Sequence, residues 1–186
     1  DRVLCMDLHS AQIQGFFDIP FDHLYAMPVL IDYFQQKQIP DMVVMAPDVG
    51  GVKMARAYAK RLSADLALAD KRRPRPDAVE MMNVIGEVEG KNVVIFDDII
   101  STGSTLVQAA RALREAGARE IYAACTHGVL CGEARELITD SVLKELVITD
   151  SIPHDPEWMP EKIKVLSVAA LLGEAIRRIH DEESLS

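Results

Sequence analysis

Apolar residues along this chain occur in short runs that alternate with stretches of helical periodicity. The runs have the length and character of buried β-strands and cover residues 3–6, 42–46, 66–69, 93–96, 121–125, 146–148 and 165–166. Between them, apolar residues recur at intervals of three and four, as on one-sided helices, over residues 28–36, 52–62, 104–116, 132–138 and 169–179. Gly117 follows the third of these helices where a C-terminal cap is expected.

The alternation of strands and helices predicts an α/β fold with a parallel sheet and helices on both of its faces. In such sheets ligands bind beyond the carboxyl ends of the strands, so the loops after strands are the places to look for chemistry. The basic stretch KRRPRP at residues 71–76 interrupts the alternation. It is too polar for a core, which predicts a mobile loop or the base of a hairpin.

Composition restricts the kinds of partner. The 186 residues carry a formal charge of -9, which disfavours a nucleic-acid surface because such surfaces neutralise phosphates with Lys and Arg. The chain has no apolar stretch of about 18 residues and no charged-then-apolar leader, so we expect no membrane span, no signal peptide and a cytoplasmic location. The three cysteines are odd in number and form no CxxC pair, which predicts buried thiols rather than disulfides or a zinc site.

The loop that follows residues 93–96 carries the clearest chemical signal. Asp97 and Asp98 come directly after the apolar run, and the start of the next predicted helix carries Ser101, Thr102, Gly103, Ser104 and Thr105. Unpaired N–H groups at a helix start, with hydroxyls beside them, form a site for a phosphate dianion. Glycine lets the backbone approach such a ligand closely.

Two carboxylates beside a phosphate site would repel the phosphate unless they hold another part of the ligand. The vicinal hydroxyls of a sugar can donate to Asp97 and Asp98 while its phosphate lies in the turn, so we predict a ribose 5-phosphate unit as ligand. The loop lacks the Lys of a Walker A motif and the spacing of GxGxxG. The alternative is that Ser104 only caps the helix and that the acids are solvated.

Residues 95–105, IFDDIISTGST, resemble the phosphoribosyl-diphosphate motif of type I phosphoribosyltransferases. Three further stretches are similar to the ribose-phosphate diphosphokinases, also called PRPP synthetases: MDLHSAQIQGFF at 6–17, PDVGGV at 47–52 and DKRRP at 70–74. The likeness runs in order from Arg2 to Ser186, whereas plain phosphoribosyltransferases share only the Asp-Asp loop. On these motifs the chain is identified as a member of the ribose-phosphate diphosphokinase family.

The resemblance implies a three-layer, parallel-sheet fold of the type I phosphoribosyltransferase kind with a flexible catalytic loop. It implies an enzyme that moves the β,γ-diphosphate of ATP onto the anomeric hydroxyl of ribose 5-phosphate, leaving AMP and giving phosphoribosyl diphosphate (PRPP) for nucleotide biosynthesis. Lys71 and Arg73 match the catalytic loop, where fixed cations offset the charge that builds on the transferred group.

The other matching residues have roles in holding the substrates. The resemblance implies that Asp97 and Asp98 orient the ribose and that residues 101–105 bind its 5-phosphate. His9 and Asp48 would help to hold Mg²⁺ on the ATP phosphates. Imidazole is an unusual partner for Mg²⁺, so His9 would act through water or contact a phosphate directly.

Family members consist of two similar α/β halves. The resemblance implies that residues 1–24 are the end of a truncated N-terminal phosphoribosyltransferase-like domain and that residues 25–186 form the C-terminal one. The missing part carries the loops for the adenine and ribose of ATP, so the chain as given is expected to bind ribose phosphate without turnover. A homo-oligomer, a hexamer built from dimers, and regulation by phosphate and ADP are also implied.

Two other functions stay open at this point. One is a non-catalytic regulatory homologue that assembles with an active synthetase, although such proteins typically alter the catalytic loop, and Lys71 and Arg73 are both present. The other is a phosphoribosyltransferase that consumes PRPP with a base, which the likeness around His9 and Lys71 argues against.

Overall fold

The computed structural model describes residues 2–72 and 81–185. Within these residues, seven strands form one sheet in the order β5-β4-β3-β6-β7-β8-β9. Their bounds are β3 (Met42–Ala46), β4 (Asp65–Arg72), β5 (Met81–Ile85), β6 (Asn92–Ile100), β7 (Glu120–Gly128), β8 (Glu145–Thr149) and β9 (Ile163–Leu166).

All neighbours in this sheet are parallel except β4 and β5, which pair antiparallel. Parallel strands need crossover connections, and helices provide most of them. The five α-helices of the described ranges are α1 (Met27–Lys37), α2 (Val52–Leu62), α3 (Ser104–Glu115), α4 (Ala134–Thr139) and α5 (Ala169–His180).

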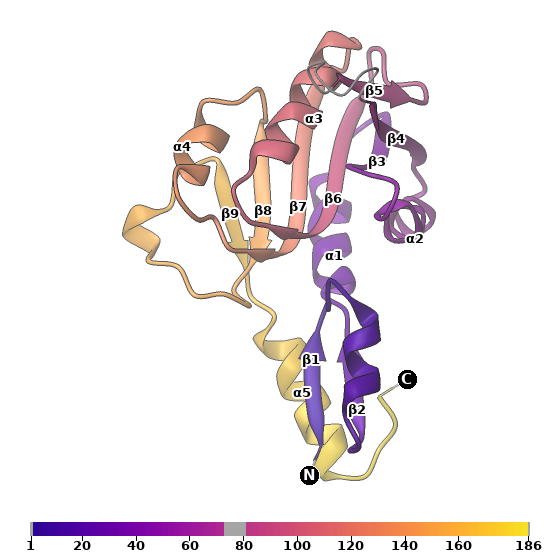
Figure 1. Ribbon diagram of the computed structural model, residues 1–186, viewed down its shortest axis with the longest axis vertical. Helices are drawn as coiled ribbons and strands as arrows, with labels where there is room; N and C mark the ends of the chain where they lie inside the picture. The colour runs from indigo at the N-terminus through magenta and orange to yellow at the C-terminus, as the bar shows by residue number, and fades with distance from the viewer. Residues whose placement is uncertain (1, 73–80, 186) are drawn as a thin grey trace.

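The sheet lies between two helical layers (Figure 1). Leu30 and Phe34 of α1 and Tyr58 of α2 pack on one face of the sheet, in a core that includes the central strand residues Val94 and Phe96. Helices α3 and α4 pack on the other face in a second core that includes the intervening residues of the same strands. Because the central strands are buried on both faces, their sequences are nearly continuous apolar runs. The predicted three-layer α/β fold is therefore confirmed.

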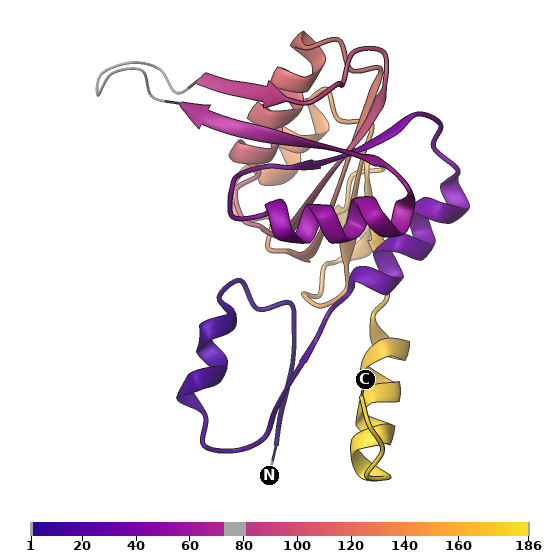
Figure 2. The same ribbon diagram turned by 90° about the vertical axis from the view of Figure 1, so that its right-hand side faces the viewer.

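A smaller unit extends from one end of the main sheet (Figure 2). Strands β1 (Val3–Met6) and β2 (Phe21–Leu24) form a separate two-stranded parallel sheet, joined through the 3-10 helix η1 (Ala11–Phe16). A small apolar cluster connects this unit to α5 and to the start of α1, and its buried members are Met6, Ala26 and Val168. The first predicted strand thus belongs to this unit and not to the main sheet.

Most predicted elements lie within two residues of their observed bounds, and residues 52–62 match α2 without any difference. Two strands were not predicted. Strand β2 has the sequence FDHL, which has no apolar run, and β5 owes its strand conformation to antiparallel pairing with β4. This pairing also confirms that the basic stretch starts at the base of a hairpin, because Lys71 and Arg72 pair with Met82 and Met81. A second short 3-10 helix, η2, covers Pro156–Trp158.

Strand β6 is longer than predicted, which corrects the position of the two acids. The prediction ended the strand at Phe96, but β6 continues to Ile100, so Asp97 and Asp98 lie within its carboxyl-terminal half. Pairing with β7 continues along this extension, with Asp97 opposite Cys125 and Ile99 opposite His127. Parallel pairing with the neighbouring strand therefore keeps the two polar residues in a strand that their sequence would end.

Helix α3 ends as the sequence predicts. Gly117 has a φ of +87°, and its N–H donates to the carbonyl of Arg114 at 3.1 Å, while the N–H of Ala118 donates to that of Leu113 at 3.0 Å. These two bonds define a Schellman cap, which requires a left-handed residue after the helix.

Within the described ranges, no helix is long and apolar enough to cross a membrane.

Candidate active site

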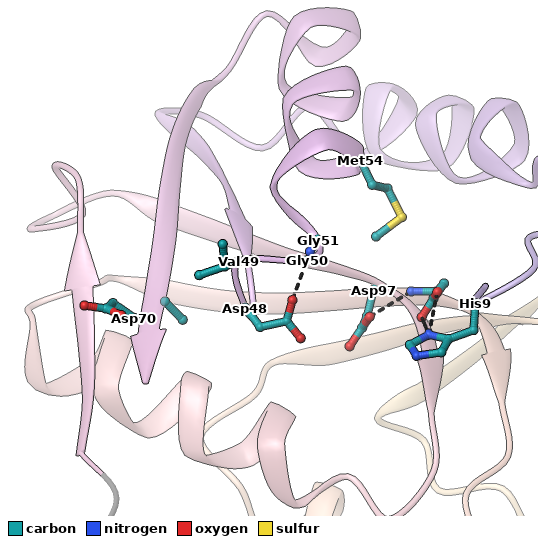
Figure 3. A pocket seen from close by; sticks show the side chains of 10 residues that line it. His9, Asp48, Val49, Gly50, Gly51, Met54, Asp70 and Asp97 are labelled. Carbon is teal, nitrogen blue, oxygen red and sulfur yellow. Dashed lines mark hydrogen bonds and ion pairs between the residues drawn. The ribbon is translucent and has the colours of Figure 1, made fainter. Parts of the chain in front are cut away.

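The carboxyl ends of β3 and β6 border a cavity of about 610 Å³ (Figure 3). These strands are neighbours in the sheet, so the loop that follows β3 lies beside the end of β6. The cavity is lined by four predicted site residues, His9, Asp48, Asp97 and Asp98. The fold thus gathers them from three separate stretches of sequence.

Asp97 lies in a more buried and more acidic environment than the sequence suggests. Burial raises its pKa to about 7, and the charges of Asp98 and Asp48 act in the same direction. The N–H of Asp98 donates to Asp97 Oδ1 at 2.9 Å, which opposes the shift but does not cancel it. A ligand that donates hydrogen bonds to this carboxyl, as a sugar hydroxyl does, would stabilise its ionised form.

His9 makes an ion pair with Asp98 across 89 residues of sequence. Its Nδ1 lies 2.9 Å from Asp98 Oδ2 and 3.2 Å from Oδ1, although 78% of the histidine side chain is exposed. The hydrogen bond with Asp98 raises the pKa of His9, and the charges of Asp98, Asp97 and Asp48 add to this effect. Because an ionised carboxylate can only accept, Nδ1 carries the proton and Nε2 is the nitrogen left for a ligand.

Asp48 follows β3 in a tight turn that leads into α2. Its Oδ1 accepts a hydrogen bond from the N–H of Gly51 at 2.9 Å. A Cβ on Gly50 would lie 3.2 Å from the same oxygen, so a glycine there leaves room for this arrangement. The turn holds an exposed carboxylate at the cavity, close enough for its charge to raise the pKa of Asp97.

The predicted phosphate loop, residues 101–105, lies next to this cavity but contributes none of its lining residues. Gly103 has a φ of +74° and is the N-cap of α3, so the N-cap residue provides no capping side chain. Ser104 is the first helical residue, and its hydroxyl lies 3.1 Å from that of Thr102. The alternative in which Ser104 caps the helix is therefore wrong, and the helix start keeps N–H groups without partners inside the helix.

Close packing from α4 explains the glycine in this loop. A Cβ on Gly103 would lie 3.3 Å from Cδ1 of Ile138, a residue of the buried core. Both the left-handed backbone and this neighbour therefore favour glycine.

The predicted catalytic loop begins at the edge of the same cavity. Asp70 of β4 lines the cavity, and the backbone of Lys71 follows it in the strand. The side chain of Lys71 and all of Arg73 lie outside the described residues. Their catalytic role stays a prediction.

Some features of the site could not be found from sequence patterns. Asp70 was not singled out, and Cys131 was not placed near the phosphate loop, where its Sγ lies 3.3 Å from Ser101 Oγ. The prediction of buried thiols is correct for Cys125 but wrong for the exposed Cys131, and Cys5 is half-buried. Cys131 follows β7, and only the position of β7 beside β6 brings it to the loop.

Known proteins resemble this chain over most or all of its length. Residues 70–186 match the family described as the phosphoribosyl synthetase-associated domain. The whole chain is 55% identical to the ribose-phosphate pyrophosphokinase of Oceanobacillus iheyensis and 53% identical to that of Bacillus subtilis. It spans 59% and 58% of the length of these two relatives.

Solved structures agree with these relationships. Phosphoribosylpyrophosphate synthetase from Mycobacterium smegmatis superposes on 98% of this chain with a TM-score of 0.90 and 37% identity, and 59% of that protein is covered. Orotate phosphoribosyltransferase from Aeropyrum pernix covers 82% of this chain, with 74% of its own length, a TM-score of 0.54 and 21% identity. The second likeness concerns the fold alone.

Proposed function

Because the chain belongs to the ribose-phosphate pyrophosphokinase family, we propose that the full-length protein transfers the diphosphate of ATP to ribose 5-phosphate, giving PRPP and AMP. In this reaction the anomeric oxygen forms a bond to the β-phosphorus of ATP, and the bond between that phosphorus and the oxygen of AMP breaks. The activity is a property of the whole protein. This chain spans about three fifths of the length of its relatives.

One observation carries the proposal: the paired acids of β6 share a cavity with His9 and Asp48. A phosphoribosyltransferase-type loop by itself accounts for Asp97 and Asp98 as acceptors for ribose hydroxyls. It does not account for a histidine from the β1–η1 segment that contacts Asp98 at 2.9 Å. The added His9 and Asp48 suit a second phosphate-bearing substrate beside the ribose.

We assign the ribose 5-phosphate to the acids and the adjoining loop. Asp97 and Asp98 accept from the sugar hydroxyls, and Ser101, Thr102, Gly103, Ser104 and Thr105 surround the 5-phosphate. The position of these residues at the start of α3 supports this assignment, because helix N-termini bind anions through their N–H groups.

The cofactor in this proposal is Mg²⁺ bound to ATP. In the part of the chain that the structure describes, no three His, Cys, Asp or Glu side chains converge as a metal cage. Mg²⁺ keeps several waters and uses few protein ligands besides substrate phosphates, so the pair of Asp48 and His9 fits such a complex. Asp48 and His9 would hold the metal on the ATP phosphates, and Mg²⁺ would supply positive charge to offset the charge that develops on the transferred group.

Within that site, the protein's own residues orient the reactants. Asp48 would offer a carboxylate oxygen to the metal, and His9 would present Nε2 to the hydrated metal or to a phosphate oxygen. Lys71 and Arg73 stabilise the charge on the transferred diphosphate and on the departing AMP oxygen. Phosphoryl-type transfer depends mainly on such positioning and electrostatic stabilisation.

The test measures products of the full-length protein with Mg²⁺, ATP and ribose 5-phosphate. We expect AMP and PRPP in equal amounts; formation of ADP instead would overturn the proposal. Exchange of free diphosphate into PRPP that requires a nucleobase would favour the phosphoribosyltransferase alternative.

Lys71→Ala tests the catalytic assignment in the same assay. We expect a loss of kcat of about 100-fold or more, because an electrostatic contact made in the transition state is removed. Lys164→Ala, which changes an exposed lysine of β9, is the matched control and should keep full activity. Unchanged synthesis of PRPP by Lys71→Ala would favour the regulatory-homologue alternative.

The domain arrangement, assembly and location are part of the same proposal. The separate β1–β2 sheet supports residues 1–24 as the end of an N-terminal domain and residues 25–186 as the C-terminal domain. A homo-oligomer, a hexamer built from dimers, with regulation by phosphate and ADP and a cytoplasmic location, follows from the family relationship and stays a prediction. Sedimentation of the full-length protein with and without phosphate tests the assembly.

A further inference from the structure

The position of His9 in the cavity depends on the backbone before it, residues 6–8. His9 lies in the connection between β1 and η1, outside the seven-stranded sheet, and its side chain is mostly exposed. Its side chain contacts Asp98, and this contact by itself would not hold an exposed side chain in one place. The contacts of Met6, Asp7 and Leu8 therefore determine where His9 lies.

His127 connects this backbone to the main sheet. Its Nε2 lies 3.0 Å from the carbonyl oxygen of Met6 and 3.1 Å from that of Asp7. Carbonyl oxygens only accept, so Nε2 carries a proton and donates to both. Nδ1 lies 2.9 Å from Ser151 Oγ, which fixes the plane of the ring.

His127 joins this backbone to the part of the sheet that carries Asp98. His127 is near the carboxyl end of β7 and pairs in register with Ile99 of β6, the residue after Asp98. The strand next to Asp98 thus also holds the segment that presents His9 to Asp98. His127 does not line the cavity, so any effect it has on the reaction must pass through other residues.

Two further contacts support the same segment. Asp7 Oδ2 accepts from the N–H of Ala26 at 2.8 Å and from the hydroxyl of Thr126, the neighbour of His127, at 2.6 Å. The N–H of Leu8 donates to Nε2 of His23 at 2.9 Å. Asp7 has a φ of +39°, an unfavourable conformation for a residue other than glycine, which these contacts maintain.

We infer that His127 is a positioning residue: its Nε2–H bonds to the carbonyls of Met6 and Asp7 hold His9 against Asp98. This inference rests on the proposed function, in which His9 meets the ATP phosphates. It extends the site to a side chain of β7 that touches neither substrate.

A double-mutant cycle in the full-length protein tests this role. We expect His127→Ala to lower kcat by about 10- to 100-fold, the usual range for residues that orient a phosphate or metal contact, with the KM for ribose 5-phosphate unchanged. In the His9→Ala background, His127→Ala should cause no further loss, because its effect passes through His9. Additive losses would overturn the inference.

Two variants separate positioning from a general structural role. His127→Gln keeps an N–H donor that reaches the same carbonyls, so we expect it to restore most of the activity lost in His127→Ala. His154→Ala is the matched control, because Nε2 of His154 lies 2.6 Å from the carbonyl oxygen of Gly128, the residue after His127 on the same strand. It should keep wild-type kcat, and an equal loss in His154→Ala would overturn the inference.

A readout independent of activity accompanies the kinetics. We expect amide hydrogen exchange of the peptide covering residues 7–17 to become faster in His127→Ala, and to stay unchanged in His127→Gln and His154→Ala. Unchanged exchange in His127→Ala would overturn the inference even if kcat fell. If the wild-type protein makes no PRPP, the proposed function fails, whereas this measurement still decides whether His127 holds the segment.

Discussion

Asp97 and Asp98 are adjacent in the chain but have different environments. Side chains alternate along a strand, so Asp97 continues the face of Ile95 and Asp98 the face of Phe96. Asp98 has a hydrogen-bonding partner in His9, whereas Asp97 is buried near other acids and has its pKa raised to about 7. The charge of Asp97 is thus sensitive to its surroundings at neutral pH.

Asp97→Asn should stabilise the protein in a pH-dependent way. A carboxyl with a raised pKa binds its proton more tightly in the native state than in the unfolded state, so stability falls as pH rises between about 4 and 7. We expect the amide variant to gain about 1 to 3 kcal/mol in free energy of unfolding at pH 8 and clearly less at pH 5. Urea unfolding of the wild-type protein and the variant at the two pH values measures this difference in free energy of unfolding.

The same variant should lose most of its activity, because an amide offers ribose hydroxyls one neutral acceptor oxygen in place of the two oxygens of a charged carboxylate. Asp18→Asn, which changes an exposed acid, is the control and should show no such dependence on pH. A gain for Asp97→Asn that is equal at pH 5 and pH 8 would contradict the raised pKa.

At the scale of elements, the loop between β6 and α3 depends on Gly103. Its left-handed backbone turns the chain from the strand into the helix, and Ile138 of α4 packs where a side chain would be. The helix start is therefore held close to α4, with a glycine as its N-cap. The groups that would bind an anion here are backbone N–H groups and exposed hydroxyl groups.

Gly103→Ala should damage both stability and binding. We expect a loss of about 1 to 2 kcal/mol in free energy of unfolding, since alanine is strained at this φ and its methyl meets Ile138. Binding of ribose 5-phosphate, measured by calorimetry, should weaken as well.

Gly173→Ala in α5 is a control of opposite sign. Gly173 is helical and exposed, and a Cβ there would meet nothing within 4 Å. We expect a gain of about 0.5 to 1 kcal/mol from helix propensity and no change in binding. A similar loss in both variants would contradict the explanation given for Gly103.

At the scale of the whole molecule, the two sheets differ in the amount of core that supports them. The seven-stranded sheet has an extensive core on each face. The smaller unit of β1, β2 and η1, together with α5 that packs on it, has the small cluster around Met6, Ala26 and Val168. Local opening costs less where fewer apolar contacts are broken, so this unit should open first.

Hydrogen exchange of the 186-residue chain tests this difference. We expect the amides of β1, β2 and α5 to exchange faster than those of β6 and β7. In the full-length protein the same amides should be better protected, if residues 1–24 belong to an N-terminal domain as proposed. Equal exchange of both units in the 186-residue chain would contradict the difference in local stability.

Much of the fold and part of the site follow from local features of the sequence. Apolar periodicity depends on which faces of an element are buried, so it predicted α2 to the residue and most other elements closely. Asp97 and Asp98 could be named from the acids and hydroxyls that follow an apolar run, whereas His9 and Asp48 were named from the resemblance of their short motifs to a known family. The left-handed conformation of Gly103 and the cap at Gly117 are likewise local, since glycine tolerates positive φ.

Tertiary structure alone decided what depends on residues far apart in the chain. Pairing with β7 extends β6 past Asp97 and Asp98, pairing with β4 forms β5, and β1 joins β2 instead of the main sheet. The contact of His9 with Asp98, the raised pKa of Asp97 and the support from His127 also require the folded chain. Sequence patterns report local geometry and burial, whereas charges and hydrogen bonds across 89 or more residues depend on where the fold places each partner.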